Sequence, residues 1–172
     1  MKLSIGSGRD TARLKAAGNW VTLDTDPAAK ADIIATLPPL PDEVMDVQWD
    51  AIEMIHVIEH FYLRDARKVL AGCYEALKPS GALILEAPDI RQACLYFLGL
   101  KEKDSTRLKD ANFYDMFAFY GHQNDKPEYQ HLWGYTPESL TNELRIAGFK
   151  RIEQKPVRNH WPWRDFRIEA IK

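Results

Sequence analysis

Cysteine is scarce in this sequence. Its two cysteines, Cys73 and Cys94, do not stand near other metal-binding residues at the spacing of a zinc site. Neither a disulfide framework nor a metal site is indicated, and a cytoplasmic location is expected. No segment approaches the roughly 18 apolar residues of a membrane-spanning helix, and no apolar run follows a basic N-terminal stretch. We therefore expect a protein that is neither exported nor embedded in a membrane.

An excess of charge of one sign is also missing. The 172 residues include 23 basic and 25 acidic side chains, which gives a formal net charge of -2. Nucleic acid is therefore not an expected partner, because the proteins that bind it usually carry a marked positive charge. The sequence has no internal repeat and no Ser/Gly-rich linker. Its length suits one domain, which we expect to span residues 1–172.

Short apolar segments alternate with helical patterns in the first half of the chain. The patterns predict strands over residues 2–5, 20–23, 32–35, 50–55 and 82–87, and helices over 10–17 and 64–77. The second helix is the clearer one, because its apolar residues recur on one face until the turn at 78–81. Strands that alternate with helices form a parallel sheet through right-handed crossovers. We therefore predict a doubly wound, Rossmann-like α/β fold.

The second half of the chain adds an insertion and two strands. Residues 91–130 are rich in aromatic side chains and weakly periodic, and we expect a helical insertion there that shapes a pocket near the active face. Thr136 then suits a helix N-cap, with Pro137 at the first helical position and Gly148 after the end. Strands are predicted over 149–157 and 166–171, joined by a connection too short for a crossover helix. The last strand should therefore run antiparallel.

The turn after the first predicted strand contains Gly6 and Gly8, and Asp24 closes the second strand. A glycine-rich turn lets the backbone approach a ligand closely, and a helix N-terminus offers N–H groups to a carboxylate or phosphate. An acidic residue at the position of Asp24 can accept hydrogen bonds from both hydroxyls of a ribose. The pair indicates a ligand that contains adenosine; the alternative is a tight turn with an exposed aspartate nearby.

The third glycine of the dinucleotide-binding motif is missing, because Thr11 stands three positions after Gly8. An oxidoreductase with a nicotinamide cofactor is therefore a minor alternative. Instead, the sequence resembles the class I S-adenosylmethionine-dependent methyltransferases over nearly its whole length. The segments that carry the resemblance are residues 3–8, 22–27, 49–60, 77–85 and 134–149, of which His56-Val57-Ile58-Glu59-His60 is the most specific.

The resemblance implies a mainly parallel seven-stranded sheet with an antiparallel last strand and S-adenosyl-L-methionine as the cofactor. The residues implied to bind this cofactor are Ile5, Gly6, Ser7, Gly8, Asp24, Thr25, Thr36, Leu37 and His56. Ser4, Asp10 and Thr36 depart from the family, which has acidic, glycine and acidic residues there. A non-catalytic S-adenosylmethionine-binding or degenerate partner protein therefore remains the alternative function. The family's N-terminal covering helices have no counterpart, so the expected cover is the insertion, a partner or nothing.

Methyl transfer from a sulfonium is an in-line displacement, in which positioning and exclusion of water supply most of the acceleration. An acceptor that must lose a proton also gains from a general base. Residues after the fourth and fifth strands are candidates, because the carboxyl ends of parallel strands form the ligand crevice. We favour His60 as the base, oriented by Glu59. In the alternative, Glu59 bonds backbone at the start of the next helix and His60 only packs.

The acceptor is expected to be a small molecule with a hydroxyl or an amine. Candidate residues for binding it are Asp89, His131 and Tyr135, although Asp89 equally suits the cap of a helix that begins near Ile90, and His131 suits a structural role. The loop 160–164 mixes two tryptophans with charged groups, which suits either ring recognition or a packed hairpin tip. DNA bases are disfavoured, because no Asn-Pro-Pro-Tyr-like segment follows the fourth strand. A homodimer stays open.

Overall fold

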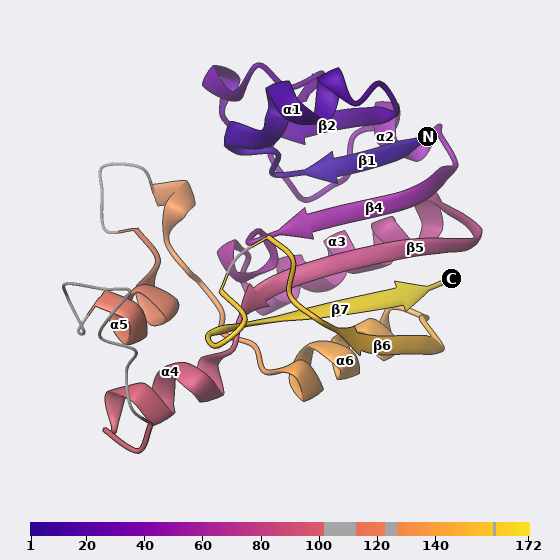
Figure 1. Cartoon of the computed structure of the whole chain (residues 1–172). Helices are drawn as coiled ribbons and strands as arrows, with labels where there is room; N and C mark the ends of the chain where they lie inside the picture. The colour runs from indigo at the N-terminus through magenta and orange to yellow at the C-terminus, as the bar shows by residue number, and fades with distance from the viewer. Residues whose placement is uncertain (102–112, 123–126, 160) are drawn as a thin grey trace.

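The computed structural model describes residues 1–101, 113–122, 127–159 and 161–172. Within these residues a seven-stranded sheet has the order β3-β2-β1-β4-β5-β7-β6 (Figure 1). Its strands are β1 (Lys2–Ile5), β2 (Trp20–Asp24), β3 (Ile33–Ile34), β4 (Trp49–Ile55), β5 (Leu77–Pro88), β6 (Arg151–Lys155) and β7 (Asp165–Ile171). All pairs from β3 to β5 are parallel, whereas β7 pairs antiparallel with both β5 and β6. The predicted fold, with its antiparallel last strand, is confirmed.

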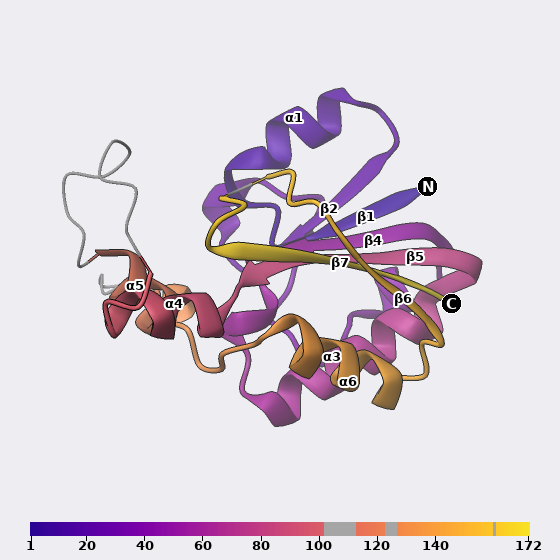
Figure 2. The same ribbon diagram turned by 60° about the horizontal axis from the view of Figure 1, so that its bottom comes forward.

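Helices cover both faces of the sheet. Helix α1 (Thr11–Ala16) lies on one face, and α3 (Leu63–Ala76) and α6 (Pro137–Ile146) lie on the other (Figure 2). A short helix, α2 (Asp42–Met45), contacts α3. The sequence pattern did not predict α2, because one turn is too short to show a helical period. Among the described residues, no helix has the length and apolar character needed to cross a membrane.

The apolar core lies between the sheet and α3. The α3 residues Ala66, Val69, Leu70 and Cys73 are buried, so the face predicted from their spacing is the one that packs. Helix α6 begins as expected, because the Thr136 side chain accepts a hydrogen bond from the N–H of Ser139 in a capping box. Burial of these side chains fixes the sheet, and with it the loops at its carboxyl edge.

Strands β5, β6 and β3 differ most from the prediction, and β6 spans Arg151–Lys155 instead of 149–157. Strand β5 begins at Leu77 instead of 82, because Leu77 pairs with Trp49 before the register jumps to Ala51 and Ala82. The predicted turn at 78–81 is therefore an irregularity inside the strand rather than its start. Strand β3 is shorter than the predicted 32–35. The Asp32 carboxylate accepts hydrogen bonds from the N–H and hydroxyl of Thr22, at 2.9 and 2.7 Å, and so holds this end of β3.

The segment 91–130 contributes helices at the carboxyl end of the parallel strands. Helices α4 (Ile90–Phe97) and α5 (Phe113–Tyr120) lie there beyond the ends of β4 and β5 (Figure 1). The chain then returns past a short 3-10 helix, η4 (Pro127–Tyr129), toward the loop that follows β4. This arrangement brings residues near position 130 beside residues near position 60.

Candidate cofactor pocket and the histidine cluster beside it

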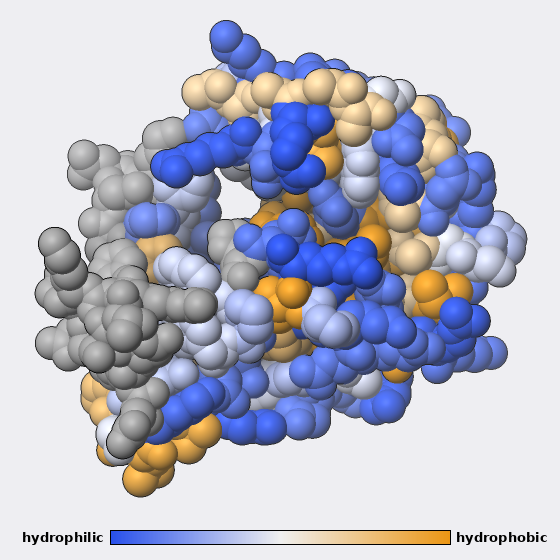
Figure 3. All heavy atoms as spheres, viewed as in Figure 1, coloured by the Kyte–Doolittle hydropathy of each residue, from blue (hydrophilic) through white to orange (hydrophobic). Residues whose placement is uncertain are grey.

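A pocket of about 590 Å³ lies at the carboxyl ends of β1, β2 and β4. This volume is within the range of small-molecule sites. The space-filling view shows the surface opened between the loops of the N-terminal half and the segment near α5 (Figure 3). Residues from both sides line the pocket, since Gly6 and Asp24 come from the first loops and Glu128 and Tyr129 from η4. The pocket therefore lies where open α/β sheets bind ligands.

Gly6 lies at the closest approach between the loops after β1 and β4. Its φ is +67°, and a Cβ built on it would lie 2.4 Å from Cγ2 of Val57. The N–H of Gly6 donates to the carbonyl of Leu23 at 2.8 Å, which holds the turn against the end of β2. A side chain at this position would be strained by both the backbone and the contact. The glycine thus allows β1 to end at the pocket wall.

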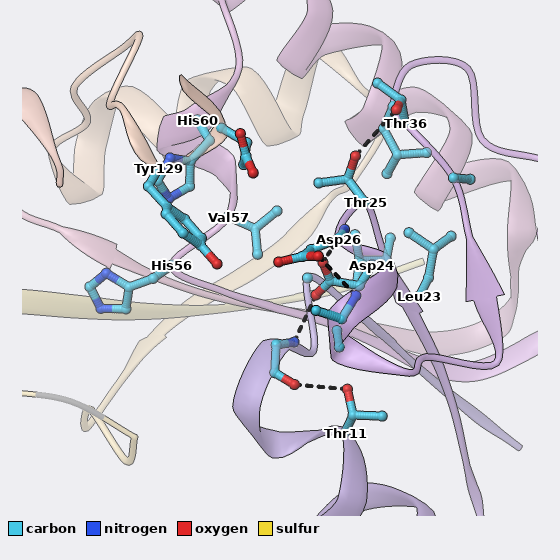
Figure 4. Close-up of a pocket in the computed structure, with 18 of the residues that line it drawn as sticks. Thr11, Leu23, Asp24, Thr25, Asp26, Thr36, His56, Val57, His60 and Tyr129 are labelled. Carbon is cyan, nitrogen blue, oxygen red and sulfur yellow. Dashed lines mark hydrogen bonds between the residues drawn. The ribbon is translucent and has the colours of Figure 1, made fainter. Parts of the chain in front are cut away.

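Asp24 connects the first loop to the end of β2. Its Oδ2 accepts a hydrogen bond from the N–H of Gly8 at 2.7 Å, and its Oδ1 accepts one from the N–H of Asp26 at 2.9 Å (Figure 4). A carboxylate has about four acceptor sites, so Asp24 keeps capacity for the two hydroxyls of a ribose. The N–H groups of Gly6, Ser7 and Gly8 already donate within the protein. The expected carboxylate cradle from these first-loop amides therefore does not stand open.

Most residues predicted to bind the cofactor line this pocket. They are Ile5, Gly6, Gly8, Asp24, Thr25, Thr36, Leu37 and His56. The hydroxyls of Thr25 and Thr36 lie 3.2 Å apart, which joins the loops after β2 and β3 (Figure 4). Ser7 is the exception, because it is buried and its hydroxyl bonds that of Thr11 at 2.8 Å. The neighbourhood predicted from sequence is therefore assembled in space.

His56, the first residue after β4, lies between two buried carboxylates. Its Nδ1 is 3.0 Å from Oε1 of Glu59, and its Nε2 is 3.3 Å from Oδ2 of Asp165. Burial lowers the pKa of His56, but Asp165 and Glu59 outweigh this and raise the pKa to about 9. Burial raises the pKa of Glu59, and the ion pair with His56 more than reverses this effect. His56 is therefore an imidazolium at neutral pH.

Glu59 consequently occupies neither of the two places expected for it. Its ion pair is with His56 and not with His60, and no side-chain hydrogen bond caps the short helix η3 (Ile58–His60). The residue is 2% exposed, and its Oε2 has no hydrogen-bond partner among the described residues. The sequence placed Glu59 beside His60 because the two are neighbours along the chain, whereas the turn of η3 directs the carboxylate toward His56.

His60 lines the pocket, and His131 packs against it. The ring centroids lie 4.9 Å apart, edge to face. Nδ1 of His60 is 2.9 Å from the carbonyl oxygen of Gln130, and Nδ1 of His131 is 2.9 Å from that of Ala118. A carbonyl oxygen can only accept, so each Nδ1 carries a proton. In the neutral form, each ring therefore has its lone pair on Nε2.

The other expected acceptor-binding residues lie outside the pocket lining. Asp89 accepts a hydrogen bond from the N–H of Arg91 at 2.9 Å, so it caps α4, as the alternative interpretation expected. Tyr135 is 1% exposed, and its carbonyl accepts from the N–H of Ile90. His131 lies beside the site, in contact with His60. None of these three residues is among the lining.

The loop before β7 forms a packed tip. The rings of Trp161 and Trp163 stack at 5.7 Å, and the Arg164 guanidinium lies 4.6 Å from the centroid of the Trp161 ring. Arg164 is buried and pairs with Asp165. His160 lies outside the described residues. The described part of this loop thus supports the packed-tip interpretation over ring recognition.

Several lining residues were missed by the sequence interpretation. They are Arg9, Thr11, Ala12, Leu23, Asp26, Ala28, Ala29, Ala35, Val57, Phe61, Glu128 and Tyr129. Arg9, Asp26 and Val57 are neighbours of predicted residues, so widening each motif would have found them. Glu128 and Tyr129 belong to the segment 91–130 that was expected to shape a pocket, but no local motif singled out either residue, because the fold alone creates their contact with the site.

The sequence profile of the family described as "Methyltransferase domain" matches residues 5–154. The chain therefore belongs to this family, and it is an S-adenosylmethionine-dependent methyltransferase. The residues present fit the cofactor, because Asp24 retains acceptor capacity at the end of β2 and the pocket is open beside Gly8, where a Cβ would meet nothing within 4 Å. No curated protein sequence matches the chain.

Solved structures share the fold at low sequence identity. A SAM-dependent methyltransferase from Archaeoglobus fulgidus is similar with a TM-score of 0.64 at 15% identity, covering 99% of this chain and 85% of that one. An O-methyltransferase family protein from Burkholderia thailandensis gives 0.61 at 12%, covering 99% and 50%. A SAM-dependent methyltransferase and possible histamine N-methyltransferase from Thermotoga maritima gives 0.58 at 16%, covering 99% and 81%. The chain thus spans half to most of the length of these proteins.

Proposed function

We propose that this protein transfers the methyl group of S-adenosylmethionine to a hydroxyl or an amine of a small molecule. The observation that carries the proposal is that Asp24, suited to a ribose, and His60, suited to a base, line the same pocket. Figure 4 shows His60 and Tyr129 on one side of this pocket and Thr25 and Thr36 on the other. The pocket can therefore hold the nucleoside at one side and an acceptor at the other.

The nucleoside side is assigned to the loops after β2 and β3. Asp24 would accept hydrogen bonds from the ribose, while Thr36 and Leu37 would border the adenine. Arg9 lines the pocket beside the first loop and brings a positive charge, which suits the carboxylate of the methionine part. When bound, the cofactor supplies a methyl group attached to a positively charged sulfonium sulfur. After the methyl group is transferred, this sulfur remains as a neutral thioether.

The acceptor side is assigned to His60. Its Nδ1 bonds the Gln130 carbonyl, so a lone pair on Nε2 can take the proton of a hydroxyl or an amine. His131 packs on His60 and fixes its ring. Two structural relatives, described as an O-methyltransferase family protein and a possible histamine N-methyltransferase, support both acceptor types.

Calorimetry and turnover test this proposal in two parts. S-adenosylmethionine and S-adenosylhomocysteine should both bind the wild type. In an assay of S-adenosylhomocysteine release over hydroxyl and amine acceptors, His60→Ala should lose at least ~100-fold in kcat, the usual scale of a general base, with binding of S-adenosylhomocysteine retained. The matched control is His122→Ala, an exposed histidine outside the lining. Full activity of His60→Ala, or failure of both nucleosides to bind at millimolar concentration, would contradict the proposal.

A further inference from the structure

Three side chains beside the pocket lie close together, and all three are of types that bind metal ions. Glu59, His60 and His131 each offer one ligand atom, and these atoms all lie within 4.8 Å of one another. Ligands at about 2.0–2.2 Å from a transition metal are about 3–4 Å apart, so a small closing of the side chains would complete the contact. Histidine spacing along the sequence gave no sign of this cluster, since His131 lies far from His60 along the chain.

Both histidines are oriented as ligands usually are. A metal-binding histidine generally donates its second ring N–H to a backbone carbonyl or carboxylate, which fixes the tautomer. His60 does so toward Gln130, and His131 toward Ala118, each at 2.9 Å. Two independent backbone carbonyls therefore leave Nε2 as the lone-pair nitrogen on both rings.

Glu59 supplies a buried carboxylate with an unused oxygen. The residue is 2% exposed, its Oε1 pairs with His56, and its Oε2 has no hydrogen-bond partner among the described residues. A buried carboxylate oxygen without a partner is costly unless a cation or a donor meets it. This observation is independent of the histidine orientations, and it points to a positively charged ligand at the same place.

We propose that Glu59, His60 and His131 bind one divalent first-row transition-metal ion at the His60 side of the pocket. Two imidazole nitrogens and one carboxylate oxygen suit zinc, manganese, cobalt or iron better than magnesium or calcium, which prefer oxygen ligands. Three protein ligands leave coordination positions open for water or an acceptor oxygen. His60 lines the pocket, so the site borders the space assigned to the acceptor.

The chemical role of the ion rests on the proposed function, whereas the binding of the ion does not. With the ion bound, Nε2 of His60 is a ligand and no longer a base. An acceptor hydroxyl that coordinates the ion loses its proton to water more readily, as metal-bound water does. Its oxygen then forms a bond to the methyl carbon while the carbon–sulfur electron pair returns to sulfur. His60 thereby remains necessary, but as a positioning ligand.

The test is cobalt titration of tag-free, full-length protein that has been treated with a chelator and dialysed. Wild type should bind one Co²⁺ per chain with visible d–d absorption, and Zn²⁺ should displace it. His131→Gln and Glu59→Gln should each weaken Co²⁺ binding at least tenfold, because each removes a ligand. The control His122→Gln changes an exposed histidine of the same segment and should bind as wild type.

Binding of S-adenosylhomocysteine, measured by calorimetry on the same samples, separates the two proposals. It also reports folding, because a variant that keeps this binding keeps the pocket. If the nucleoside binds and Co²⁺, Mn²⁺ and Zn²⁺ do not bind at millimolar concentration, the metal site is refuted alone. Unchanged Co²⁺ binding in His131→Gln and Glu59→Gln would refute it too. If the metal binds and the nucleoside does not, the proposed function fails and the metal site stands.

Discussion

A Cβ on Gly6 would lie 2.4 Å from Cγ2 of Val57, so the loops after β1 and β4 touch where only a glycine fits. Both residues line the pocket. The contact fixes the floor of the pocket, because β1 and β4 are neighbouring strands whose carboxyl ends meet at this edge. The shape of this pocket therefore depends on one missing side chain.

Gly6→Ala should lower the free energy of unfolding by about 1–3 kcal/mol, because alanine is strained at φ +67° and its Cβ overlaps Val57. Affinity for S-adenosylhomocysteine should also fall. Urea denaturation and calorimetry measure the two effects. Gly8→Ala is the control, since its φ is +45° but its Cβ would meet nothing within 4 Å. Adding Val57→Ala to Gly6→Ala should restore part of the loss; equal stability of the two glycine variants would contradict the steric argument.

Asp24→Ala should weaken S-adenosylhomocysteine binding by at least about tenfold, which corresponds to ~1.4 kcal/mol. The reason is twofold: the ribose loses its acceptor, and the N–H groups of Gly8 and Asp26 lose the carboxylate that holds the loop. Asp24→Asn keeps one side-chain oxygen, so its affinity for S-adenosylhomocysteine should lie between those of the wild type and Asp24→Ala. Calorimetry is the measurement, with the exposed Asp46→Ala as the matched control. If Asp24→Ala bound S-adenosylhomocysteine with wild-type affinity, the assignment of Asp24 to the ribose would be wrong.

Asp32→Ala should cost about 1 kcal/mol at pH 7, because Thr22 loses its acceptor, while the exposed pair with Lys15 adds little. Burial raises the pKa of Asp32, but hydrogen bonds from Lys15 and Thr22 outweigh it, so the folded pKa lies below the ordinary value. A lowered folded pKa stabilises the protein above the unfolded pKa of about 3.9 and loses this contribution as the pH falls through the folded pKa.

The difference in stability between wild type and Asp32→Ala should therefore be constant from about pH 7 to 5 and shrink below about pH 4. Urea denaturation across this range checks it. Lys15→Ala isolates the ion pair and should have a small effect at all these pH values. A difference that grows toward low pH would show that the carboxylate of Asp32 does not stabilise the folded state.

His56→Leu should destabilise the protein by about 3–5 kcal/mol, because it leaves the carboxylates of Glu59 and Asp165 without their shared cation. A leucine also fits poorly at φ +54°, which adds to the loss. Chemical denaturation at pH 7 is the measurement. His122→Leu, at an exposed position, provides the comparison and should change stability by less than about 0.5 kcal/mol. A loss below 1 kcal/mol for His56→Leu would mean that the buried pair is not held by this imidazole.

Much of the fold followed from local pattern. The apolar stripe of α3, the Thr136 cap and the glycine turn after β1 depend on residues close in sequence, so their physical chemistry can be read along the chain. Two of the boundaries that failed, those of β5 and β3, depend on distant partners. Strand β5 starts at Leu77 because Trp49 pairs with it, and β3 is short where Asp32 bonds Thr22. Neither partner is visible in a local window.

The site divides in the same way. Gly6, Gly8 and Asp24 were predicted, because a turn and a strand end have sequence signals, and they line the pocket. The partner of Glu59 was predicted wrongly, since adjacency in sequence favoured His60 while a positive φ at His56 turns its imidazole toward Glu59. Glu128 and Tyr129 lie in the segment 91–130 that was expected to shape a pocket, although no motif singled them out.

The sequence by itself determined the order of strands and helices, the glycine-rich loop and the aspartate that follows it, because each is encoded in residues a few positions apart. Only the tertiary structure decided that the ligand atoms of His131, His60 and Glu59 lie within 4.8 Å of one another, and that His56 lies between Glu59 and Asp165. The physical reason is that charges and lone pairs act through space over a few ångströms. The chain that brings them together is held by a hydrophobic core elsewhere.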